Sequence, residues 1–194
     1  MRRVHDLHTD AAARYPVSGR GAFGLREFAT VVPEAGGLVT PTIREIVTAY
    51  YGGPFRVDSL TSWRIEHVAP NPRHEAYSDF WHCDNAPVSL LKLYVNLSHV
   101  RADTGAFRLH PIPSTRAIMR AGYWSRWRMT GRARRLADDP ARIVIFDGAP
   151  GTACFCNTER CLHRAAIPRA GTYRDIVEIK FAAVSRSPHS RHSP

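Results

Sequence analysis

The 194-residue chain contains no run of apolar residues long enough to cross a bilayer, which argues against a membrane span. The first residues, Met1 to His8, carry charge, but no apolar segment follows them, so we expect no secretory signal and a cytoplasmic protein. The hydrophobic content of 44% is that of an ordinary globular protein, and the length is enough for one domain with a full core.

The chain also lacks the paired C-x-x-C spacing of a structural zinc site. It has only four cysteines: Cys83, Cys154, Cys156 and Cys161. Without an export signal, these residues are expected to remain free thiols in a reducing compartment. Buried cysteines within strands are the simplest interpretation, and a metal or redox role is the alternative.

Acidic residues are outnumbered, 17 against 27 basic ones, which gives a formal net charge of +10. Much of the excess lies between Arg116 and Arg135. No zinc finger, recognition-helix pattern or RNA-binding strand motif accompanies it, so a nucleic-acid partner is not favoured. Two interpretations of this segment stay open: it recruits an anionic substrate, or it is the solvated face of an outer helix.

The local patterns predict a mainly β protein. Residues 42–50 read as a helix, with Thr40 as its cap, Pro41 in its first turn and Gly52-Gly53 at its end. Short strands with turns between them follow: Phe55–Val68, Val88–Val100, Ala106–Leu109, Arg142–Asp147, Thr152–Cys156, Leu162–Ile167 and Thr172–Val184. This series is typical of a barrel or jelly roll.

Two segments depart from the strand pattern. Residues 114–135 carry few helix breakers and are predicted to be a helical or irregular insertion, which could form a lid over a barrel mouth. Residues 185–194 are polar and basic and are predicted to be a disordered tail. The sequence therefore predicts one domain over residues 1–184.

The most informative motif is His82-Cys83-Asp84. In an extended strand, residues i and i+2 point to the same side, so His82 and Asp84 can reach one metal ion while Cys83 faces away. A third ligand must come from elsewhere, and His163 follows a strand and a loop that a barrel would bring round. A second copy, His8-Thr9-Asp10, lies in a segment without a strand pattern and is expected to be a surface segment or helix cap.

The wider context resembles one known family. The stretches Trp81–Asp84, Leu90–Leu97 and Asp103–Pro111, together with His163 and Arg174 eleven residues later, resemble the phytanoyl-CoA dioxygenase-like family. This family is a branch of the Fe(II)/2-oxoglutarate-dependent oxygenases. The resemblance covers roughly residues 60–183. The chain departs from the family pattern at Ile112-Pro113-Ser114 and at Ala165, where the family commonly has other residues.

The resemblance implies a double-stranded β-helix, also called a jelly-roll or cupin-like barrel, and the helix predicted over residues 42–50 would flank it on the N-terminal side. It implies that His82, Asp84 and His163 bind Fe(II), that 2-oxoglutarate chelates the iron, and that Arg174 pairs with the distal carboxylate of the keto acid. The implied reaction consumes O2, releases succinate and CO2, and hydroxylates an unactivated C–H of a small-molecule substrate, which could be anionic or carrier-linked. Arg169 is the weaker candidate for the carboxylate, because its turn position favours solvent.

Lys92, Tyr94 and Asn157 are further candidates for the co-substrate site. Lys92, Tyr94 and Asn96 form one polar face of a strand that otherwise consists of Leu and Val. This face either is a solvent-facing stripe or points into the barrel, where Lys92 or Tyr94 would contact the co-substrate. Asn157 could orient a metal ligand or the co-substrate without touching the metal itself. The alternative to an oxygenase is a cupin-like module that binds a metal or ligand without oxygenation, and such a module needs no arginine at position 174.

Overall fold

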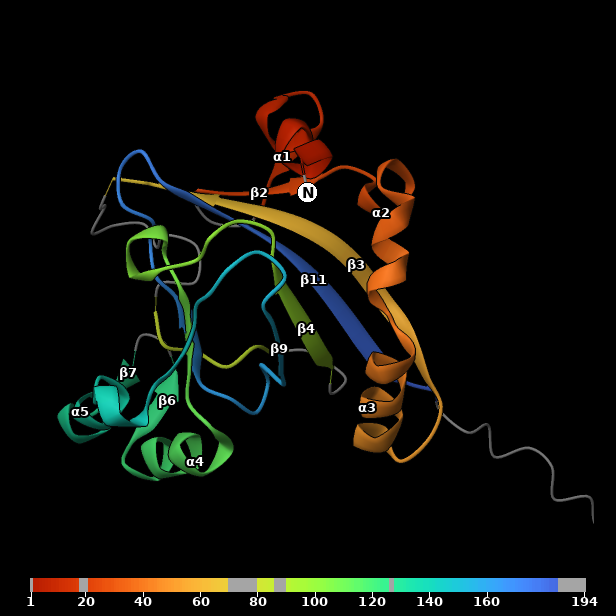
Figure 1. Cartoon of the computed structure of the whole chain (residues 1–194). Coiled ribbons are helices and arrows are strands. Elements are labelled where there is room, and N and C mark those ends of the chain that lie inside the picture. The colour runs from red at the N-terminus through yellow and green to blue at the C-terminus, as the bar shows by residue number, and fades with distance from the viewer. Residues whose placement is uncertain (1, 18–20, 70–79, 86–89, 126–127, 185–194) are drawn as a thin grey trace, which may run out of the picture.

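The longest strands lie antiparallel at the centre of the molecule. In the computed structural model, which describes residues 2–17, 21–69, 80–85, 90–125 and 128–184, β3 (Phe55–Glu66) pairs along its length with β11 (Tyr173–Ala183) (Figure 1). The other side of β11 pairs with β4 (Leu91–Asn96), and β9 (Ala153–Cys156) follows β4. The sheet continues beyond β3 through β2 (Ala22–Leu25) to β1 (Arg14–Pro16).

A smaller sheet faces this one. It has the order β10-β5-β8, formed by His163–Ala165, Phe107–Leu109 and Val144–Phe146. The chain passes back and forth between the two sheets. It runs from β4 of the large sheet to β5 and β8 of the small sheet, returns to β9, crosses again to β10 and ends in β11 of the large sheet. This alternation between two antiparallel sheets is the double-stranded β-helix, so the predicted mainly β jelly-roll fold is confirmed.

The two faces of the large sheet differ in character. On β4 and β11, Leu93 and Ile179 alternate with Lys92 and Glu178, as the two-residue period of a strand requires. The apolar side packs under α1 (Arg2–Thr9), α2 (Phe28–Val31), the short 3-10 helix η1 (Pro33–Leu38) and α3 (Pro41–Tyr51). The opposite side faces the interior of the barrel.

The helix predicted over residues 42–50 is confirmed as α3. The Thr40 hydroxyl accepts a hydrogen bond from the Ile43 amide at 3.3 Å, which satisfies one of the free N–H groups of the first turn. Gly52 ends the helix with φ at +65°, a conformation that glycine adopts without steric cost. The tyrosine at the end of α3, Tyr51, donates to the Phe181 carbonyl at 2.5 Å and so joins the helix to the large sheet.

The motif His8-Thr9-Asp10 lies at the end of a helix, which was one of its two predicted positions, but the surface position is wrong for His8. The residue lies in α1 and is fully buried against β3, where its Nε2 lies 2.9 Å from the Ser62 hydroxyl. The helix has only eight residues and shows too few apolar positions for its buried face to be recognised from the sequence pattern. Its burial depends on a tertiary contact with a strand more than fifty residues away.

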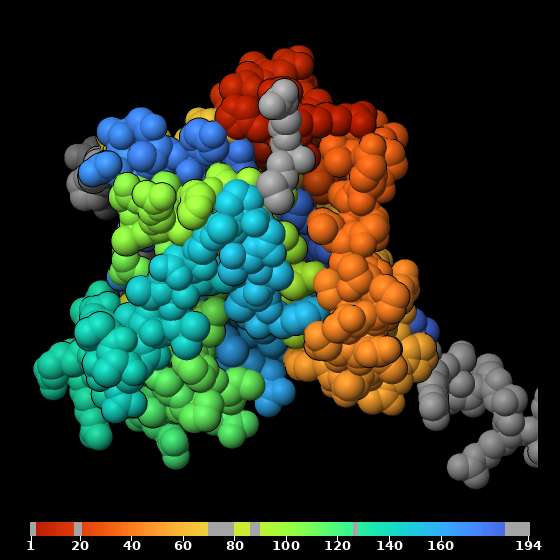
Figure 2. All heavy atoms as spheres, in the orientation of Figure 1, coloured from red at the N-terminus to blue at the C-terminus, as the bar shows by residue number. Residues whose placement is uncertain are grey.

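The insertion is largely helical, as predicted. It contains α4 (Ile112–Arg120), α5 (Gly131–Ala137) and the 3-10 helix η3 (Pro140–Arg142), with a small hairpin of β6 (Tyr123–Ser125) and β7 (Arg128–Met129). Ile118 and Ala133 pack around Trp81 and Leu162 in a second core cluster. The segment forms a lobe beside the barrel, on the side away from the N-terminal helices (Figure 2).

The remaining expectations fall partly outside the described residues. The tail predicted over 185–194 lies outside them, as do the first residues of the strand predicted over Val88–Val100. The connection between β4 and β5 contains the 3-10 helix η2 (Ala102–Thr104). None of the described helices is long and apolar enough to cross a membrane.

Candidate metal centre

Backbone pairing brings the two key histidines together from distant parts of the chain. The His82 amide donates to the His163 carbonyl at 2.9 Å, and the His163 amide donates back to the His82 carbonyl at 2.8 Å. His163 is fixed on its other side by pairing with Leu109 of β5. Two residues after His82, the Asp84 amide donates to the Thr158 carbonyl at 2.9 Å, which holds this short segment against the loop before β10.

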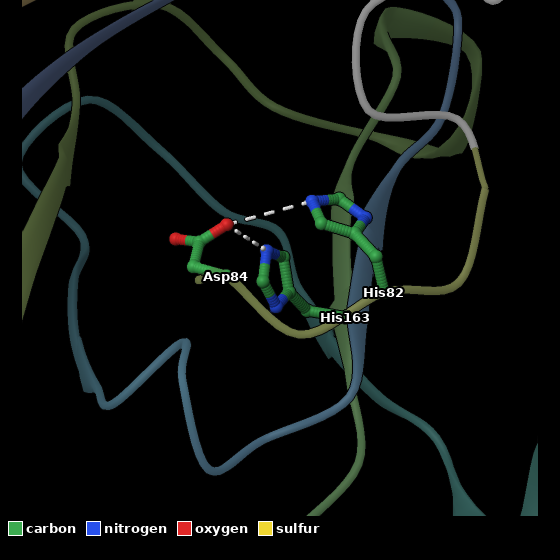
Figure 3. Close-up of side chains that lie close together, drawn as sticks. All are labelled: His82, Asp84 and His163. Atoms are coloured by element: carbon green, nitrogen blue, oxygen red, sulfur yellow. Dashed lines mark ion pairs between the residues drawn. The ribbon is translucent and has the colours of Figure 1, made fainter. Parts of the chain in front are cut away.

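The three side chains converge on one point. One carboxylate oxygen of Asp84, Oδ1, lies 3.6 Å from Nε2 of His82 and 3.5 Å from Nε2 of His163 (Figure 3). The three candidate ligand atoms all lie within 4.8 Å of one another. The predicted grouping of His82, Asp84 and His163 is therefore present, and in the described part of the chain it is the one cluster of this kind.

Both imidazoles are held in the tautomer that metal binding requires. Nδ1 of His82 lies 2.7 Å from the Phe80 carbonyl, and Nδ1 of His163 lies 2.9 Å from the Cys161 carbonyl. A carbonyl only accepts, so each Nδ1 must carry its proton and donate. Nε2 is therefore the nitrogen of each ring that is left to bind a metal once it carries no proton, and backbone contacts of this type orient histidine ligands in metal sites.

The donor set fits a divalent transition metal. Ligand atoms about 2.1 Å from a metal and at right angles to one another lie about 3 Å apart, close to the separations seen between Asp84 and the two histidines. Two imidazoles and one carboxylate on one face leave the other coordination positions open, which is the ligand pattern of non-haem Fe(II) oxygenases.

The cysteines take no part in this site. All four are free thiols, as predicted. Burial raises the pKa of Cys83 to about 12, and burial also raises the pKa of the other three. The thiols therefore stay protonated near neutral pH, whereas a metal ligand must be a thiolate. Cys83 packs against the cluster around Trp81.

The second oxygen of Asp84 is held by a lysine. Nζ of Lys92 lies 2.6 Å from Oδ2 of Asp84 and 3.7 Å from Oε2 of Glu178. Burial alone would raise the pKa of Asp84, but the contact with His163 and the Lys92 charge hold it well below its usual range. Burial lowers the pKa of Lys92, and the charges of Glu178 and Asp84 outweigh it, so the net shift is upward. Both groups are therefore charged over the whole neutral range.

Glu178 also contacts Tyr94 and Lys180. The Tyr94 hydroxyl donates to its Oε2 at 2.8 Å, and Nζ of Lys180 lies 3.3 Å from its Oε1. Burial, followed by the Glu178 charge, raises the pKa of Tyr94 well above its usual value, so the phenol stays a hydrogen-bond donor. Four strongly polar side chains thus form one connected network beside Asp84.

A cavity of about 250 Å³ opens beside the metal ligands. Its charged lining comprises three basic and two acidic side chains: Lys92, Arg174, Lys180, Asp84 and Glu178. The remaining lining residues are Trp63, Ile65, Tyr94, Phe107, Phe146, His163, Ala165 and Ile176. Lys92 and Tyr94 therefore face the interior, as one of the two interpretations of this polar face predicted. Asn96, the third residue of that face, is fully buried and is not a lining residue.

Arg174 lies on the wall of the same cavity and is only 3% exposed. Its guanidinium donates to the Gly105 carbonyl, in the turn that precedes β5. Gly105 has φ at +79°, and a Cβ there would collide with the Ala166 carbonyl, so the close approach of these segments requires glycine. Arg169, in contrast, is 73% exposed and lies near Asp103, as expected for a solvated turn residue.

Asn157 lies elsewhere. Its side-chain amide donates to the Tyr50 hydroxyl at 2.8 Å, and its Oδ1 accepts from the Arg160 amide at 3.0 Å. It is not among the lining residues of the cavity. Its contacts shape the turn that contains Thr158, whose carbonyl holds the Asp84 amide. Asn157 thus supports the segment of Asp84 indirectly, and its predicted role toward the co-substrate stays a prediction.

The described residues of the arginine-rich insertion also contribute nothing to the cavity lining. Glu178, Lys180 and Phe107 do line it, although none of them was among the predicted site residues. For Glu178 and Lys180 a signal was available, because both share the two-residue period of Arg174 along one predicted strand.

No protein-family model and no curated protein matches the sequence. Solved structures do resemble the fold. The carbocyclase SnoK from nogalamycin biosynthesis, described as non-haem and α-ketoglutarate-dependent, gives a TM-score of 0.62 at 19% identity, over 92% of this chain and 71% of its own. The epimerase SnoN, in complex with Fe3+, α-ketoglutarate and nogalamycin RO, gives 0.61 at 13% identity, over 100% and 82%.

HygX from Streptomyces hygroscopicus, with nickel and 2-oxoglutarate bound, gives a TM-score of 0.59 at 9% identity, over 94% of this chain and 78% of its own. At these identities the likeness concerns the fold. It agrees with the class that strand order defines here, a double-stranded β-helix with a His-Asp-His cluster beside an interior cavity.

Proposed function

We propose that the chain is a non-haem Fe(II)/2-oxoglutarate-dependent oxygenase of the phytanoyl-CoA dioxygenase-like type, with residues 1–184 as its catalytic domain. One observation carries the proposal. Two oriented Nε2 atoms and one carboxylate oxygen converge beside a cavity whose wall also holds the buried Arg174. A module that only binds a metal needs the first feature and has no use for the second.

Each residue has a defined role in this proposal. His82, Asp84 and His163 bind Fe(II). The iron, once loaded with the keto acid, supplies the O2 chemistry that converts 2-oxoglutarate to succinate and CO2. Arg174 binds the distal carboxylate of 2-oxoglutarate, because a guanidinium matches a carboxylate in two parallel hydrogen bonds. The aromatic and aliphatic side chains of the wall, Phe107 and Ile176 among them, limit access of water.

We further propose a small-molecule substrate that is hydroxylated at an unactivated C–H. Hygromycin B in a HygX structure and nogalamycin RO in a SnoN structure support this substrate class. The charges of the cavity support a neutral or anionic molecule. The charges of a metal dication and a dianionic keto acid cancel. The three basic and two acidic side chains of the lining then leave one positive charge in the cavity. Of the two lysines, Lys180 is the more exposed.

The test is anaerobic addition of Fe(II) and then 2-oxoglutarate to metal-free protein. Chelation of the iron by the keto acid is expected to produce a visible charge-transfer band, and admission of O2 is expected to release succinate even without substrate. Metal binding with neither a band nor succinate would instead support the cupin-like module. The absence of metal binding would remove both functions.

A further inference from the structure

The chain contains only two lysines among its 27 basic residues, Lys92 and Lys180, and both line the cavity. They lie directly opposite each other on β4 and β11, with Glu178 two residues before Lys180 on the same face. A chain that otherwise uses arginine for positive charge thus places both of its lysines around one buried carboxylate. A lysine carries a compact charge on a flexible stem, which can enter the narrow space between two acids more easily than a planar guanidinium.

The two oxygens of the Asp84 carboxylate have different partners, because Lys92 contacts only one of them. Oδ1 is the oxygen directed at the two Nε2 atoms, and Oδ2 is the oxygen that receives the ammonium group at 2.6 Å. With Oδ2 occupied in this way, the carboxylate can offer a metal only Oδ1. A carboxylate free to rotate could instead bind through both oxygens and take up one of the open positions.

Lys92 is itself held in place. It is only 7% exposed, and Oε2 of Glu178 lies 3.7 Å from its ammonium group. That same oxygen accepts from the Tyr94 hydroxyl at 2.8 Å, and Glu178 is 5% exposed. Tyr94 and Glu178 are cross-strand partners, so the sheet fixes the distance between their backbones. The ammonium group therefore has a second, rigidly held acidic partner besides Asp84.

We propose that Lys92 is a positioning residue that keeps Asp84 as a one-oxygen metal ligand, with Glu178 and Tyr94 as its anchor. This inference rests on the proposed metal site and changes one expectation from the sequence, in which Lys92 contacts the co-substrate. The positioning role and the co-substrate contact predict that Lys92 responds to different ligands. A positioning residue responds to the metal, whereas a co-substrate contact responds to 2-oxoglutarate.

The first experiment measures the affinity of the full chain for Fe(II) under anaerobic conditions and for Co(II), without co-substrate. Lys92→Met keeps the stem and removes the charge, and we expect metal affinity to fall about 10- to 100-fold, the usual effect of losing a partner of a metal ligand. Lys180→Met is the matched control, because Lys180 contacts Glu178 and not Asp84. Its metal affinity should stay within about threefold of the parent.

The second experiment needs no variant at position 92 and therefore does not depend on whether Lys92→Met folds. Lysine labelled with 13C at Cε gives two side-chain NMR signals in this chain, and Lys180→Arg assigns them. Addition of Zn(II), as a diamagnetic probe, should shift the Lys92 signal strongly and the Lys180 signal little. Later addition of 2-oxoglutarate should shift Lys92 less than the metal did.

The outcomes separate the two proposals. If the parent protein binds no metal, the proposed function fails. If it binds metal while Lys92→Met binds equally well and the Lys92 signal stays in place, the function stands and the positioning role is overturned. A normal metal affinity with a weakened 2-oxoglutarate affinity in Lys92→Met also overturns it and makes Lys92 a co-substrate contact.

Discussion

Arg174 is a buried cation on the wall of the cavity that Asp84 and His163 also line, and its guanidinium donates to the Gly105 carbonyl of the neighbouring turn. A carboxylate placed there would form charge-assisted hydrogen bonds in a site shielded from water. We predict that Arg174→Gln weakens 2-oxoglutarate affinity by about 30-fold or more, since each such bond contributes about 1.5–3 kcal/mol. Titration of the charge-transfer band with 2-oxoglutarate measures this affinity.

Arg169→Gln is the matched control for that titration, because Arg169 is an exposed arginine on the same hairpin. Its variant should bind the keto acid as the parent does, and Fe(II) affinity should be unchanged in both variants. Equal 2-oxoglutarate affinity in Arg174→Gln and the parent would remove the feature that separates an oxygenase from the metal-binding module.

At the scale of one element, buried polar contacts hold helix α1 against the large sheet. Nε2–H of His8 donates to the Ser62 hydroxyl, which in turn donates to the Ile176 carbonyl at 3.1 Å. Nδ1 of His8 is buried and has no hydrogen-bond partner in the described structure. Burial is the main cause that lowers the His8 pKa to about 4, against an opposing contribution from Asp175. The nearby Arg64 also lowers it.

This contact makes folding stability depend on pH. The folded state binds the His8 proton only near pH 4, whereas the unfolded state binds it near pH 6.5. The free energy of unfolding should therefore be highest above about pH 6.5 and should fall by up to about 3 kcal/mol toward pH 4. Urea titrations at a series of pH values measure the change, and His8→Gln should reduce the slope in this range. An equal slope in both proteins would assign the pH dependence to other groups.

The sequence predicted the positions of the strands better than the direction of their side chains. Strands with a clear two-residue period were predictable, and so were His82 and Asp84 as ligands on one side of the chain. The inward direction of Lys92 could be stated only as one of two alternatives, because the period does not tell which face is covered by helices. The contact between Lys92 and Glu178 depends on the register of β4 against β11, which no local pattern contains.

Residues outside regular elements were the hardest to place. Asn157 lies in a turn, where no period indicates the direction of the side chain, and its partner Tyr50 is 107 residues away. His8 was misplaced for a related reason, since the short α1 is stabilised by tertiary contacts and not by its own pattern. Polar residues that are buried through long-range contacts are the class that sequence patterns describe least well.

At the scale of the whole molecule, metal binding should be coupled to folding. His82 and His163 are 81 residues apart in the sequence. Reciprocal backbone hydrogen bonds between these two residues join the segment that contains His82 and Asp84 to β10. The three-ligand site therefore exists in the folded state and not in an unfolded chain, so a metal stabilises the former. At a concentration about 100 times its Kd, a ligand contributes about 2.7 kcal/mol.

For a domain of this length, about 2.7 kcal/mol corresponds to a Tm rise of roughly 5–10 °C. We predict such a rise when Fe(II) or Zn(II) is added to chelator-treated protein, and its loss in Asp84→Ala, which keeps both histidines. Because Arg174 lines one cavity with Asp84 and His163, 2-oxoglutarate should raise Tm further only when metal is present. A rise with 2-oxoglutarate alone, or an equal metal-induced rise in Asp84→Ala, would mean that the stabilising site lies outside this cavity.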